Sequence, residues 1–498
     1  MTCDALIVGA GPVGLTLAGE LGRYGLRVRI VDKASHPSDK SKALVVWSRT
    51  LELMARLGCT QAFLARGLKA TGARITAGKN EIGHVTLDKI PTPYPYALVI
   101  PQSETERLLE KHLASFALKV EREVEWLQFS NSANGVISKV RHANGREESI
   151  ESRWLVGCDG PHSAVRHQLA LPFHGDTLSS DWLLADVHLN NVPHPTEIQL
   201  NWHADGVLAI FPITETRFRV IADTGNNLTD APRPAPTLEE VQTVIDQRGM
   251  AGIKATEPVW LASFRINERK VKDYRVGRVF LAGDAAHIHS PAGGQGMNTG
   301  MQDAFNLAWK FALVHRGECE EEPLLGSYST ERSAVGEQIL AATGRLTSVS
   351  ILKGGVKQSI RNHVAAFLFG LAPVRKMMAD TLSELSIGYP KSPLSIKGVG
   401  PGGGPAPGQR APIRENELPV GSGNSPRFAL FAEDDANASG LIAKYGELLE
   451  QKVRKPFQPG GLWLIRPDGY AAVATSHDDY TRVSSFLDLL GAKHAGSP

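Results

Sequence analysis

The opening residues combine a short apolar run, a glycine-rich turn and a helical repeat. Residues 5–8 are continuously apolar, as expected for a buried strand at the centre of a parallel sheet. The next apolar positions mark one face of a helix: Val13, Leu17 and Leu21. Residues 27–31 then alternate into a second strand that ends at Asp32. The pattern predicts a βαβ unit with a tight turn at residues 9–14.

Two later segments repeat an apolar strand pattern that ends in an acidic residue. Residues 154–158 run into Asp159 and Gly160, and residues 279–282 run into Gly283 and Asp284. In open α/β sheets, ligands bind in the crevice outside the carboxyl ends of the strands. We therefore expect both aspartates to point into one ligand crevice.

The rest of the chain divides into regions of different pattern. Residues 172–270 are rich in alternating segments, at 197–202, 207–211 and 218–222, and residues 74–100 also look β-like. Residues 297–378 have a helical pattern. Glycines and prolines crowd residues 398–408, which marks a domain boundary before a small α/β module.

The composition is that of an ordinary globular protein. Apolar residues make up 42% and charged residues 21%, which excludes a mostly disordered chain. The net charge of +2 excludes the basic footprint of a dedicated nucleic-acid binder, so we expect no nucleic-acid partner. The four cysteines form no CxxC pair, so we expect no metal site and a reducing compartment. Without an apolar run of membrane-spanning length or a signal peptide, we expect a cytoplasmic protein with no membrane partner.

The glycines of the first turn have the spacing of a dinucleotide-binding motif. Gly9 permits the tight turn, Gly11 lets a pyrophosphate approach the backbone, and Gly14 lets the helix pack closely on the strand. The helix N-terminus adds free N–H groups and a partial positive charge. Asp32 follows at the distance of a ribose-binding acid. The set predicts a dinucleotide site; the alternative is a glycine-rich turn that binds nothing.

A second glycine loop favours FAD over NAD as the dinucleotide. Gly283 and Asp284 are followed by the loop 290–298, which opens a helix. The second acid could hold a ribose or ribityl hydroxyl, and the helix N-terminus could stabilise an anion such as a reduced flavin. A simple Rossmann dehydrogenase does not need this loop.

Three motifs in this order resemble the single-component FAD-dependent aromatic hydroxylases, the class A flavoprotein monooxygenases of the para-hydroxybenzoate hydroxylase type. They are residues 9–14, 158–166 and 283–298. Further matches are residues 42–43, 49–52, 101–102, 106–107 and 327–332. The sequence resembles most the branch of pentachlorophenol monooxygenase, the polyketide hydroxylases and phenol hydroxylase. Residues 408–412 and 466–470 are similar to the C-terminal thioredoxin-like module of that branch, and the absence of a CxxC makes it redox-silent.

The resemblance implies an α/β fold in which a Rossmann-like FAD-binding domain is interleaved with a β-sheet substrate domain. The FAD-binding domain would comprise residues 1–75, 101–171 and 271–345, and the substrate domain residues 76–100 and 172–270. A helical connection would follow at 346–397, a Gly/Pro linker at 398–412 and a thioredoxin-like C-terminal domain at 413–498.

The resemblance also implies roles for individual residues. Gly9, Gly11 and Gly14 would hold the FAD pyrophosphate and Asp32 the adenosine ribose. Lys42 and Gln102 would contact the cofactor near the ribityl chain and the flavin. The predicted cofactor site further includes Pro12, Val13, Lys33 and Val124.

The two later motifs would complete the cofactor site. Asp159 and Gly160 belong to a motif that this family uses for both FAD and pyridine nucleotide, and Asp284 would bind the ribityl or pyrophosphate region. Gly296, Met297 and Asn298 would face the pyrimidine edge of the flavin, and the predicted cofactor site also includes Gly283, Pro291 and Gly294.

The implied reaction uses FAD, NADPH or NADH as co-substrate, and O2 to hydroxylate a small phenolic substrate through a flavin C4a-hydroperoxide. Pro291 would sit over the flavin near the substrate hydroxyl. A base that ionises the phenol would help. His289 is the first candidate and His203 the second, and the alternative for His289 is a loop histidine bonded to the backbone. The predicted substrate-binding residues are Trp47, His203, Phe211 and Pro212.

Two other functions stay open at this point. The same flavin could perform a Baeyer–Villiger oxygenation of a ketone, because the difference lies in the substrate and in peroxide protonation. Alternatively the chain could be a non-catalytic FAD-binding protein that recruits partners through its C-terminal domain. A homodimer is a further possibility.

Overall fold

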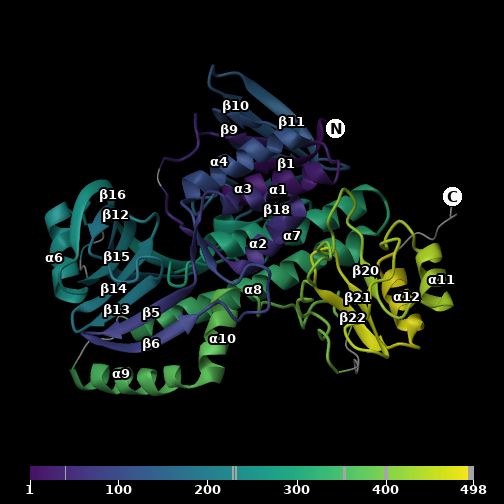
Figure 1. Ribbon diagram of the computed structural model, residues 1–498. Helices are drawn as coiled ribbons and strands as arrows, with labels where there is room; N and C mark the ends of the chain where they lie inside the picture. The colour runs from purple at the N-terminus through teal and green to yellow at the C-terminus, as the bar shows by residue number, and fades with distance from the viewer. Residues whose placement is uncertain (40, 227–228, 230–232, 351–354, 397–401, 492–498) are drawn as a thin grey trace.

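The N-terminal βαβ unit forms the centre of an eight-stranded mixed sheet in the computed structural model, which describes residues 1–39, 41–226, 229, 233–350, 355–396 and 402–491 (Figure 1). Strand β1 (Cys3–Val8) pairs in parallel with β2 (Val28–Asp32) and with β11 (Glu147–Gly157). Helix α1 (Pro12–Arg23) joins β1 to β2, with Pro12 at its first turn. The other strands are β8 (Val120–Arg122), β9 (Val124–Asn131), β10 (Val136–His142), β17 (Arg275–Val276) and β18 (Val279–Leu281). The predicted βαβ unit is confirmed.

Three parallel strands of this sheet end at the same edge. In the register, Val8 of β1 lies beside Gly157 of β11, and Gly157 lies beside Leu281 of β18. Asp159 and Asp284 follow directly after β11 and β18. The topology therefore brings both aspartates to the edge where the glycine turn lies, as their position after apolar strands predicts.

A second eight-stranded sheet lies beside the first and contains residues from distant parts of the chain (Figure 1). Its order is β19-β16-β12-β15-β14-β13-β5-β6, antiparallel except where β13 pairs with β5. The strands are β5 (Gly72–Ala77), β6 (Asn80–Thr86), β12 (His174–Asn190), β13 (Ile198–His203), β14 (Gly206–Pro212), β15 (Arg217–Asn226), β16 (Lys254–Lys270) and β19 (His287–Ile288). The predicted boundary between residues 75 and 76 lies inside β5.

One helix within the strand-rich region is absent from the sequence prediction. Helix α6 (Leu238–Arg248) covers one face of the second sheet. Its residues Val241 and Ile245 are buried against that sheet. Thr237 and Glu240 form a reciprocal capping box at its start. That pair was the available signal, because a Thr followed three residues later by Glu marks a helix N-terminus.

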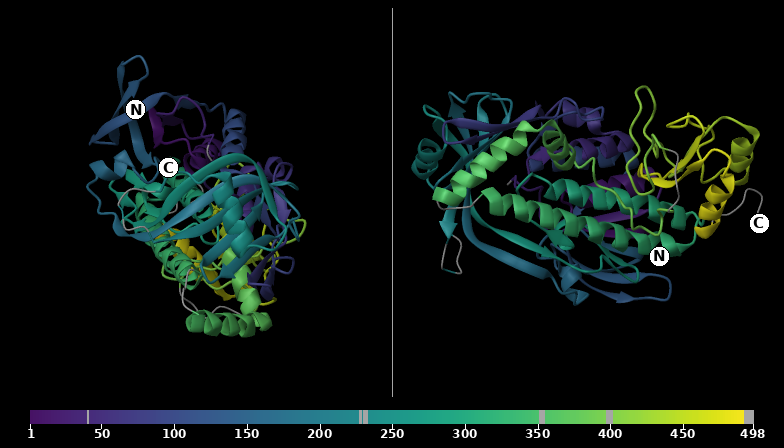
Figure 2. Two further views of the ribbon diagram at one scale, coloured as in Figure 1. Left: turned by 90° about the vertical axis from the view of Figure 1, so that its left-hand side faces the viewer. Right: turned by 90° about the horizontal axis from the view of Figure 1, so that it is seen from below.

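Helices connect the two sheets and close the second one from below (Figure 2). Helix α7 (Gly296–His315) packs against α1, and α8 (Glu321–Ser350) runs on toward the second sheet. Helices α9 (Gly355–Gly370) and α10 (Ala372–Leu382) pack against β6. The remaining elements of this part are α2 (Ser48–Leu57), α3 (Thr60–Leu64), α4 (Gln102–Leu113), α5 (Ala164–Gln168), β3 (Val45–Val46), β4 (Leu68–Ala70) and β7 (Ala97–Val99), with one-turn helices at Ala114–Phe116 and Gly283–Ala285.

The C-terminal module is a three-stranded antiparallel sheet with two helices. Its elements are β20 (Ala429–Phe431), β21 (Gly461–Ile465), β22 (Ala471–Ser476), α11 (Ala436–Lys444) and α12 (Tyr480–Leu489). Residues 402–412 of the predicted linker have no helix or strand, and residues 397–401 lie outside the described part. All four cysteines are buried and unpaired. Among the described helices, none has the length and apolarity needed to cross a membrane.

Buried ion pairs join the C-terminal module to helices α7 and α8. The Arg466 guanidinium lies 2.6 and 3.0 Å from the two carboxylate oxygens of Glu331 on α8. Lys310 Nζ on α7 lies 2.9 Å from the same carboxylate. All three side chains are fully buried. The module is therefore anchored by charge pairs that water does not reach.

Candidate active site

A polar cavity of about 410 Å³ opens where the strands of the first sheet end. Its walls are the glycine turn, residues 42–45, residues 158–161 and the loop 284–297. The lining includes His289, the predicted base, and eleven residues that the sequence predicts as cofactor contacts: Gly11, Pro12, Val13, Lys42, Gln102, Gly160, Asp284, Pro291, Gly294, Gly296 and Met297. The structure thus brings together residues from three distant motifs.

The three glycines of the first turn have different structural roles. A Cβ atom on Gly9 would lie 2.4 Å from the Cys158 carbonyl oxygen, and one on Gly14 would lie 2.0 Å from the Gly9 carbonyl oxygen. Neighbouring backbone atoms therefore leave no room for a side chain at Gly9 or Gly14. A Cβ atom on Gly11 would meet no atom within 4 Å, because Gly11 faces the cavity. Helix α1 begins there without a side-chain cap, so its first N–H groups are available to an anion.

Eight of the predicted cofactor residues are absent from the lining of this cavity: Gly9, Gly14, Asp32, Lys33, Val124, Asp159, Gly283 and Asn298. The two carboxylate oxygens of Asp32 accept backbone N–H groups from Ala10 at 2.7 Å and Ala34 at 2.8 Å. Asp32 therefore braces the glycine turn. Lys33 is exposed on the surface, and Val124 is buried in the core at the start of β9.

The two aspartates at the strand ends differ in exposure, because Asp159 is half-buried whereas Asp284 is exposed to the polar cavity. Asp159 Oδ2 accepts N–H groups of Ala164 at 2.7 Å and Val165 at 3.3 Å, whereas Asp159 Oδ1 is buried and has no partner among the described residues. Burial raises the pKa of Asp159 above its ordinary value. Desolvation by the surrounding cavity walls also raises the pKa of Asp284, although the charges of His287 and Lys42 oppose the shift. Both carboxyl groups would gain from a hydroxyl donor on a ligand.

His289 is held neutral at the start of the second glycine loop. Its Nδ1–H donates to the Ser290 carbonyl at 3.0 Å, which is the backbone-bonded arrangement named above as the alternative. Burial and the neighbouring His287 lower the pKa of His289 to about 4. Its Nε2 has no partner among the described residues, and a Cβ atom on Gly296 would lie 3.6 Å from it. Nε2 is therefore an acceptor near the start of α7.

Asn298 fixes the loop through the backbone and does not line the cavity. Its Oδ1 accepts the Trp47 N–H at 2.8 Å, and its Nδ2 donates to the carbonyls of Val45 at 2.8 Å and Gly294 at 3.0 Å. Trp47 Nε1 in turn donates to the Gly293 carbonyl at 2.9 Å. These bonds tie the loop to the strand segment on the other side of the cavity.

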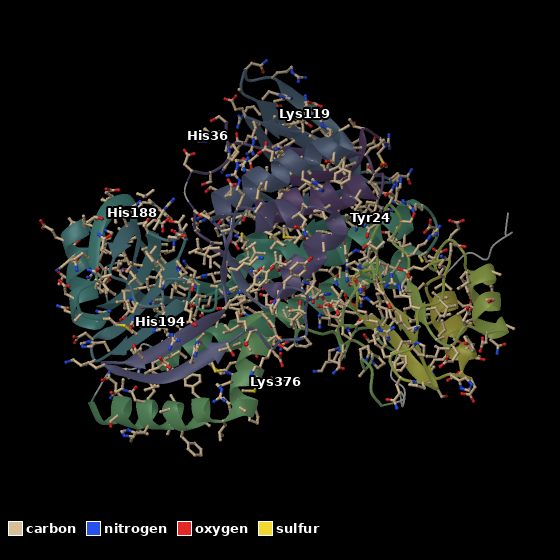
Figure 3. All side chains as sticks on the ribbon, viewed as in Figure 1. Tyr24, His36, Lys119, His188, His194 and Lys376 are labelled. Carbon is tan, nitrogen blue, oxygen red and sulfur yellow. The ribbon has the colours of Figure 1, made fainter. Side chains whose placement is uncertain are left out.

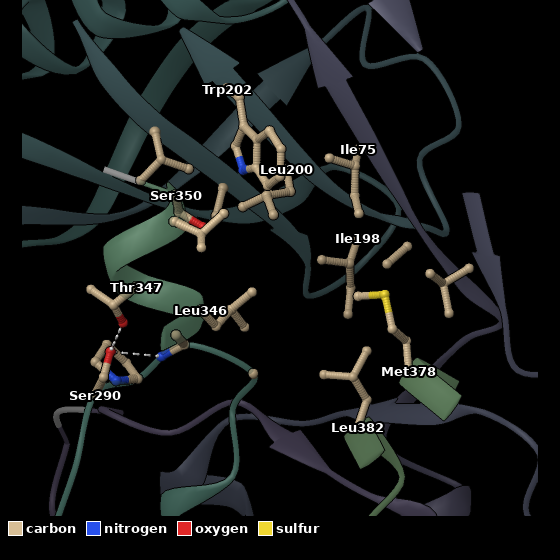
Figure 4. Close-up of a pocket in the computed structure, with 18 of the residues that line it drawn as sticks. Ile75, Ile198, Leu200, Trp202, Ser290, Leu346, Thr347, Ser350, Met378 and Leu382 are labelled. Atoms are coloured by element: carbon tan, nitrogen blue, oxygen red, sulfur yellow. Dashed lines mark hydrogen bonds between the residues drawn. The ribbon is translucent and has the colours of Figure 1, made fainter. Parts of the chain in front are cut away.

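An apolar cavity of about 460 Å³ adjoins the polar one (Figure 4). The two cavities share four lining residues: Phe211, Ile221, Ser290 and Pro291. Ile75 and Trp202 enter from the second sheet, whereas Met378 and Leu382 enter from α10. Arg345 is the one residue with a charged side chain among the lining residues that the structure describes.

The predicted substrate residues divide between this cavity and other places. Trp47 and Phe211 line the apolar cavity. His203 and Pro212 line neither cavity; His203 Nδ1 lies 3.3 Å from an Asp205 carboxylate oxygen at a strand end, and Pro212 is buried at the end of β14. The structure does not bring His203 to the site as a base.

Sequence reasoning missed two polar features of the site. The hydroxyl groups of Ser290 and Thr347 form a hydrogen bond of 2.7 Å beside Pro291, which is drawn as a dashed line in Figure 4. Arg219 lines the polar cavity and donates to the Lys42 carbonyl at 2.7 Å. Its guanidinium also forms a bidentate salt bridge with the Asp186 carboxylate. The available signal for Arg219 was an arginine inside the apolar segment 218–222.

Glu384 is a buried acid beside the second glycine loop and carries a prediction. It follows α10 with a positive φ of 60° and accepts a hydrogen bond from Gln302 of α7. Burial raises its pKa to about 8. Because an unfolded glutamate has a pKa near 4.5, the native state keeps a proton that the unfolded state loses. The stability that this retained proton contributes is fully present below about pH 4.5 and is lost as the pH rises through about 8.

We therefore expect Glu384→Gln to raise the stability at about pH 8 relative to the wild type, and to flatten the dependence of stability on pH. Thermal unfolding of both proteins at about pH 5 and pH 8 measures this. Glu415→Gln, at an exposed glutamate, is the control and should follow the wild type. Parallel pH dependence of Glu384→Gln and wild type would contradict the assignment.

Comparison with known proteins gives one family throughout. Residues 2–343 match the family described as FAD binding domain. The chain is 34% identical to 6-methylpretetramide 4-monooxygenase of Streptomyces rimosus, over 98% of this chain and 93% of that protein. It is 33% identical to pentachlorophenol 4-monooxygenase of Sphingobium chlorophenolicum, over 68% of this chain and 63% of that protein.

A solved structure agrees with these sequence relatives. The anhydrotetracycline hydroxylase OxyS from Streptomyces rimosus aligns with a TM-score of 0.82 and 28% identity, covering 99% of this chain and all of that one. The likeness includes the C-terminal module, because nearly the whole chain is covered. The resemblance expected from the three motifs is confirmed.

Proposed function

The chain belongs to the class A FAD-dependent aromatic hydroxylases and has FAD as its cofactor; on this basis we propose that it uses NADPH or NADH and O2 to hydroxylate a hydrophobic phenolic substrate. One observation carries the proposal. The polar cavity and the apolar cavity meet at Pro291, so a cofactor in the first would face a substrate in the second.

The residues of the polar cavity fit FAD. The open space at Gly11 and the uncapped start of α1 suit a pyrophosphate, and the unpartnered Asp159 Oδ1 suits a hydroxyl donor. We place the flavin ring against Gly294 and Gly296, where α7 also begins without a side-chain cap. When bound, FAD accepts a hydride from the nicotinamide and activates O2 for transfer of one oxygen atom.

The protein's own residues would position the cofactor and exclude water from the reaction site. Lys42 and Gln102 close the polar cavity on one side, and Gln102 Oε1 accepts the Ala43 N–H at 3.1 Å. The hydrocarbon walls of the apolar cavity exclude water from the point where the two cavities meet. We assign Asp32, which braces the turn through Ala10, to the ribose end of the cofactor.

We assign His289 to cofactor contact and not to proton removal from the substrate. A base with a pKa near 4 takes a proton from a phenol poorly, and efficient general bases titrate near the working pH. The unpartnered Nε2 is free to accept a hydrogen bond from the cofactor.

This assignment predicts the pH dependence of turnover. We expect kcat of the wild type to show no step from His289 between about pH 6 and pH 8, because that side chain is already neutral there. His289→Gln should lower FAD affinity by about tenfold while its pH profile stays parallel to the wild type. A wild-type step near pH 6.5 that disappears in His289→Gln would contradict the assignment.

The apolar cavity indicates the size and polarity of the substrate. A cavity of about 150 Å³ lined by hydrocarbon holds one benzene ring. The observed 460 Å³ therefore suits a neutral compound of several fused rings. The two relatives are named for 6-methylpretetramide and for pentachlorophenol, a one-ring phenol, so the expectation of fused rings rests on the cavity volume and not on the relatives.

Anaerobic reduction of the flavin tests the proposal. The holoenzyme is mixed with NADPH or NADH, with and without a panel of one-ring and fused-ring phenols, and bleaching of the visible flavin band is followed. We expect a fused-ring phenol to accelerate reduction. Bleaching that no phenol accelerates would contradict the phenolic substrate, and a protein that is never reduced would favour the non-catalytic alternative.

A further inference from the structure

The outer face of α9 and α10 is an unusually apolar surface. We call residues 355–382 the α9–α10 hairpin. Several of its exposed side chains are large and apolar, with Phe367 69% exposed, Met377 60% and Ile360 59%, and the exposed polar residues Ser359 and His363 lie among them. Val364 and Leu371 extend the same face. Soluble proteins rarely expose apolar residues in such a group without a partner.

The hairpin lies at the edge of the molecule. Figures 1 and 2 show α9 running along the foot of the second sheet, with no other element below it. Figure 3 shows Lys376 of α10 at the same end. A broad flat surface could therefore approach α9 without meeting the rest of the protein.

The inner face of the same hairpin lines the apolar cavity. Ala365, Phe369 and Met378 point inward, and Phe369 packs where a side chain on Gly83 of β6 would otherwise lie. Leu368 both lines the cavity and is 42% exposed, and Val349 of α8 lines it and is 45% exposed. The cavity is therefore walled at this point by residues that also belong to the exposed apolar face.

The charge around this face is positive. The basic side chains that the structure describes in the hairpin are Arg361, which is buried, Arg375, which is half-buried, and Lys376, and the single acidic residue, Asp380, is half-buried. Lys376 is exposed, and Arg345 is an exposed residue at the cavity wall on α8. The nearby Glu81 of β6 is paired with Arg74.

We propose that the α9–α10 hairpin seats the protein on an anionic lipid bilayer and that hydrophobic substrate passes from the bilayer into the apolar cavity. Helices that lie in a membrane interface combine large apolar side chains with basic residues. Lys376 and Arg345 suit the negative charge of anionic lipid headgroups, whereas a second copy of this face presents the same positive side chains. The membrane binding is inferred from the exposed surface alone, whereas the passage of substrate from the bilayer rests on the proposed function.

The proposal departs from the expectation of no membrane partner. That expectation rested on the absence of a membrane-spanning run, and a helix that lies in the interface does not need one.

Vesicle flotation tests the proposal with the holoenzyme. The probes are vesicles of equal parts phosphatidylglycerol and phosphatidylcholine, and vesicles of phosphatidylcholine alone. We expect flotation with the anionic vesicles and weak flotation with the neutral ones. Phe367→Ser should weaken binding by about tenfold, because it removes the most exposed aromatic side chain of the face.

Leu418→Ser is the matched control, because Leu418 is 75% exposed on the C-terminal module, away from the hairpin. It should float like the wild type. Failure of the wild type to bind anionic vesicles, or equal weakening in both variants, would overturn the proposal. A dimer in light scattering that Phe367→Ser converts to a monomer would make this face a subunit interface instead.

Flotation does not depend on turnover, so its failure is separate from failure of the proposed hydroxylation. Phe367 lines neither cavity, and we expect flavin reduction in free solution to be unchanged in Phe367→Ser. Circular dichroism of each variant confirms folding before flotation.

Discussion

Replacing Gly11 with valine is expected to weaken FAD binding by roughly a hundredfold or more while the apoprotein keeps its stability. Gly11 has φ −76° and ψ −176°, an extended conformation open to any residue. A Cβ atom there meets no protein atom within 4 Å. The added side chain therefore enters only the space that the pyrophosphate would occupy.

Gly14→Ala is the matched control for Gly11→Val. Its Cβ atom would lie 2.0 Å from the Gly9 carbonyl oxygen, so this smaller change should lower the stability of the apoprotein itself. Titration with FAD and thermal unfolding of the apoproteins separate the two effects. A Gly11→Val protein that binds FAD like the wild type would contradict our placement of the pyrophosphate.

Glu331→Ala is expected to destabilise the protein by about 3–5 kcal/mol, because it leaves Arg466 and Lys310 buried without their shared partner. Burial opposes ionisation of Glu331, but the charges of Arg466 and Lys310 hold its pKa below the ordinary value. The contribution is therefore present above the ordinary glutamate pKa and is lost as pH falls through the lower native value.

Glu447→Ala is the control for Glu331→Ala. The Glu447 side chain is 77% exposed and lies 3.7 Å from Arg427, so its removal should cost less than about 1 kcal/mol. Urea unfolding at neutral pH measures both variants. Equal losses would contradict the view that buried charge pairs anchor the C-terminal module.

Local pattern predicted the parts of the site that lie close together in sequence. The strand, glycine turn and helix at residues 3–23 follow from apolar runs and glycine spacing. Asp159 and Asp284 could be placed at one sheet edge because each follows an apolar strand, and parallel strands end together. The loop at residues 290–298 could be linked to a flavin because it opens a helix, but the roles of its individual residues came only from the family resemblance.

Contacts between distant segments could not be predicted. Glu331 and Arg466 meet across 135 residues, and no local pattern links them. His203 follows directly after the alternating segment 197–202, but alternation does not show which strand end lies at the cavity. The helical pattern of α9 identified a helix, whereas its position over the substrate cavity depends on how the second sheet folds.

Oxygen labelling tests the central claim most directly. The holoenzyme, NADPH or NADH and a fused-ring phenol that accelerates flavin reduction are incubated under ¹⁸O2, and the product is analysed by mass spectrometry. We predict a phenolic product that carries one labelled oxygen atom on a ring carbon. A product without labelled oxygen would contradict monooxygenation, and a ring-expanded labelled ester would replace aromatic hydroxylation with the Baeyer–Villiger reaction.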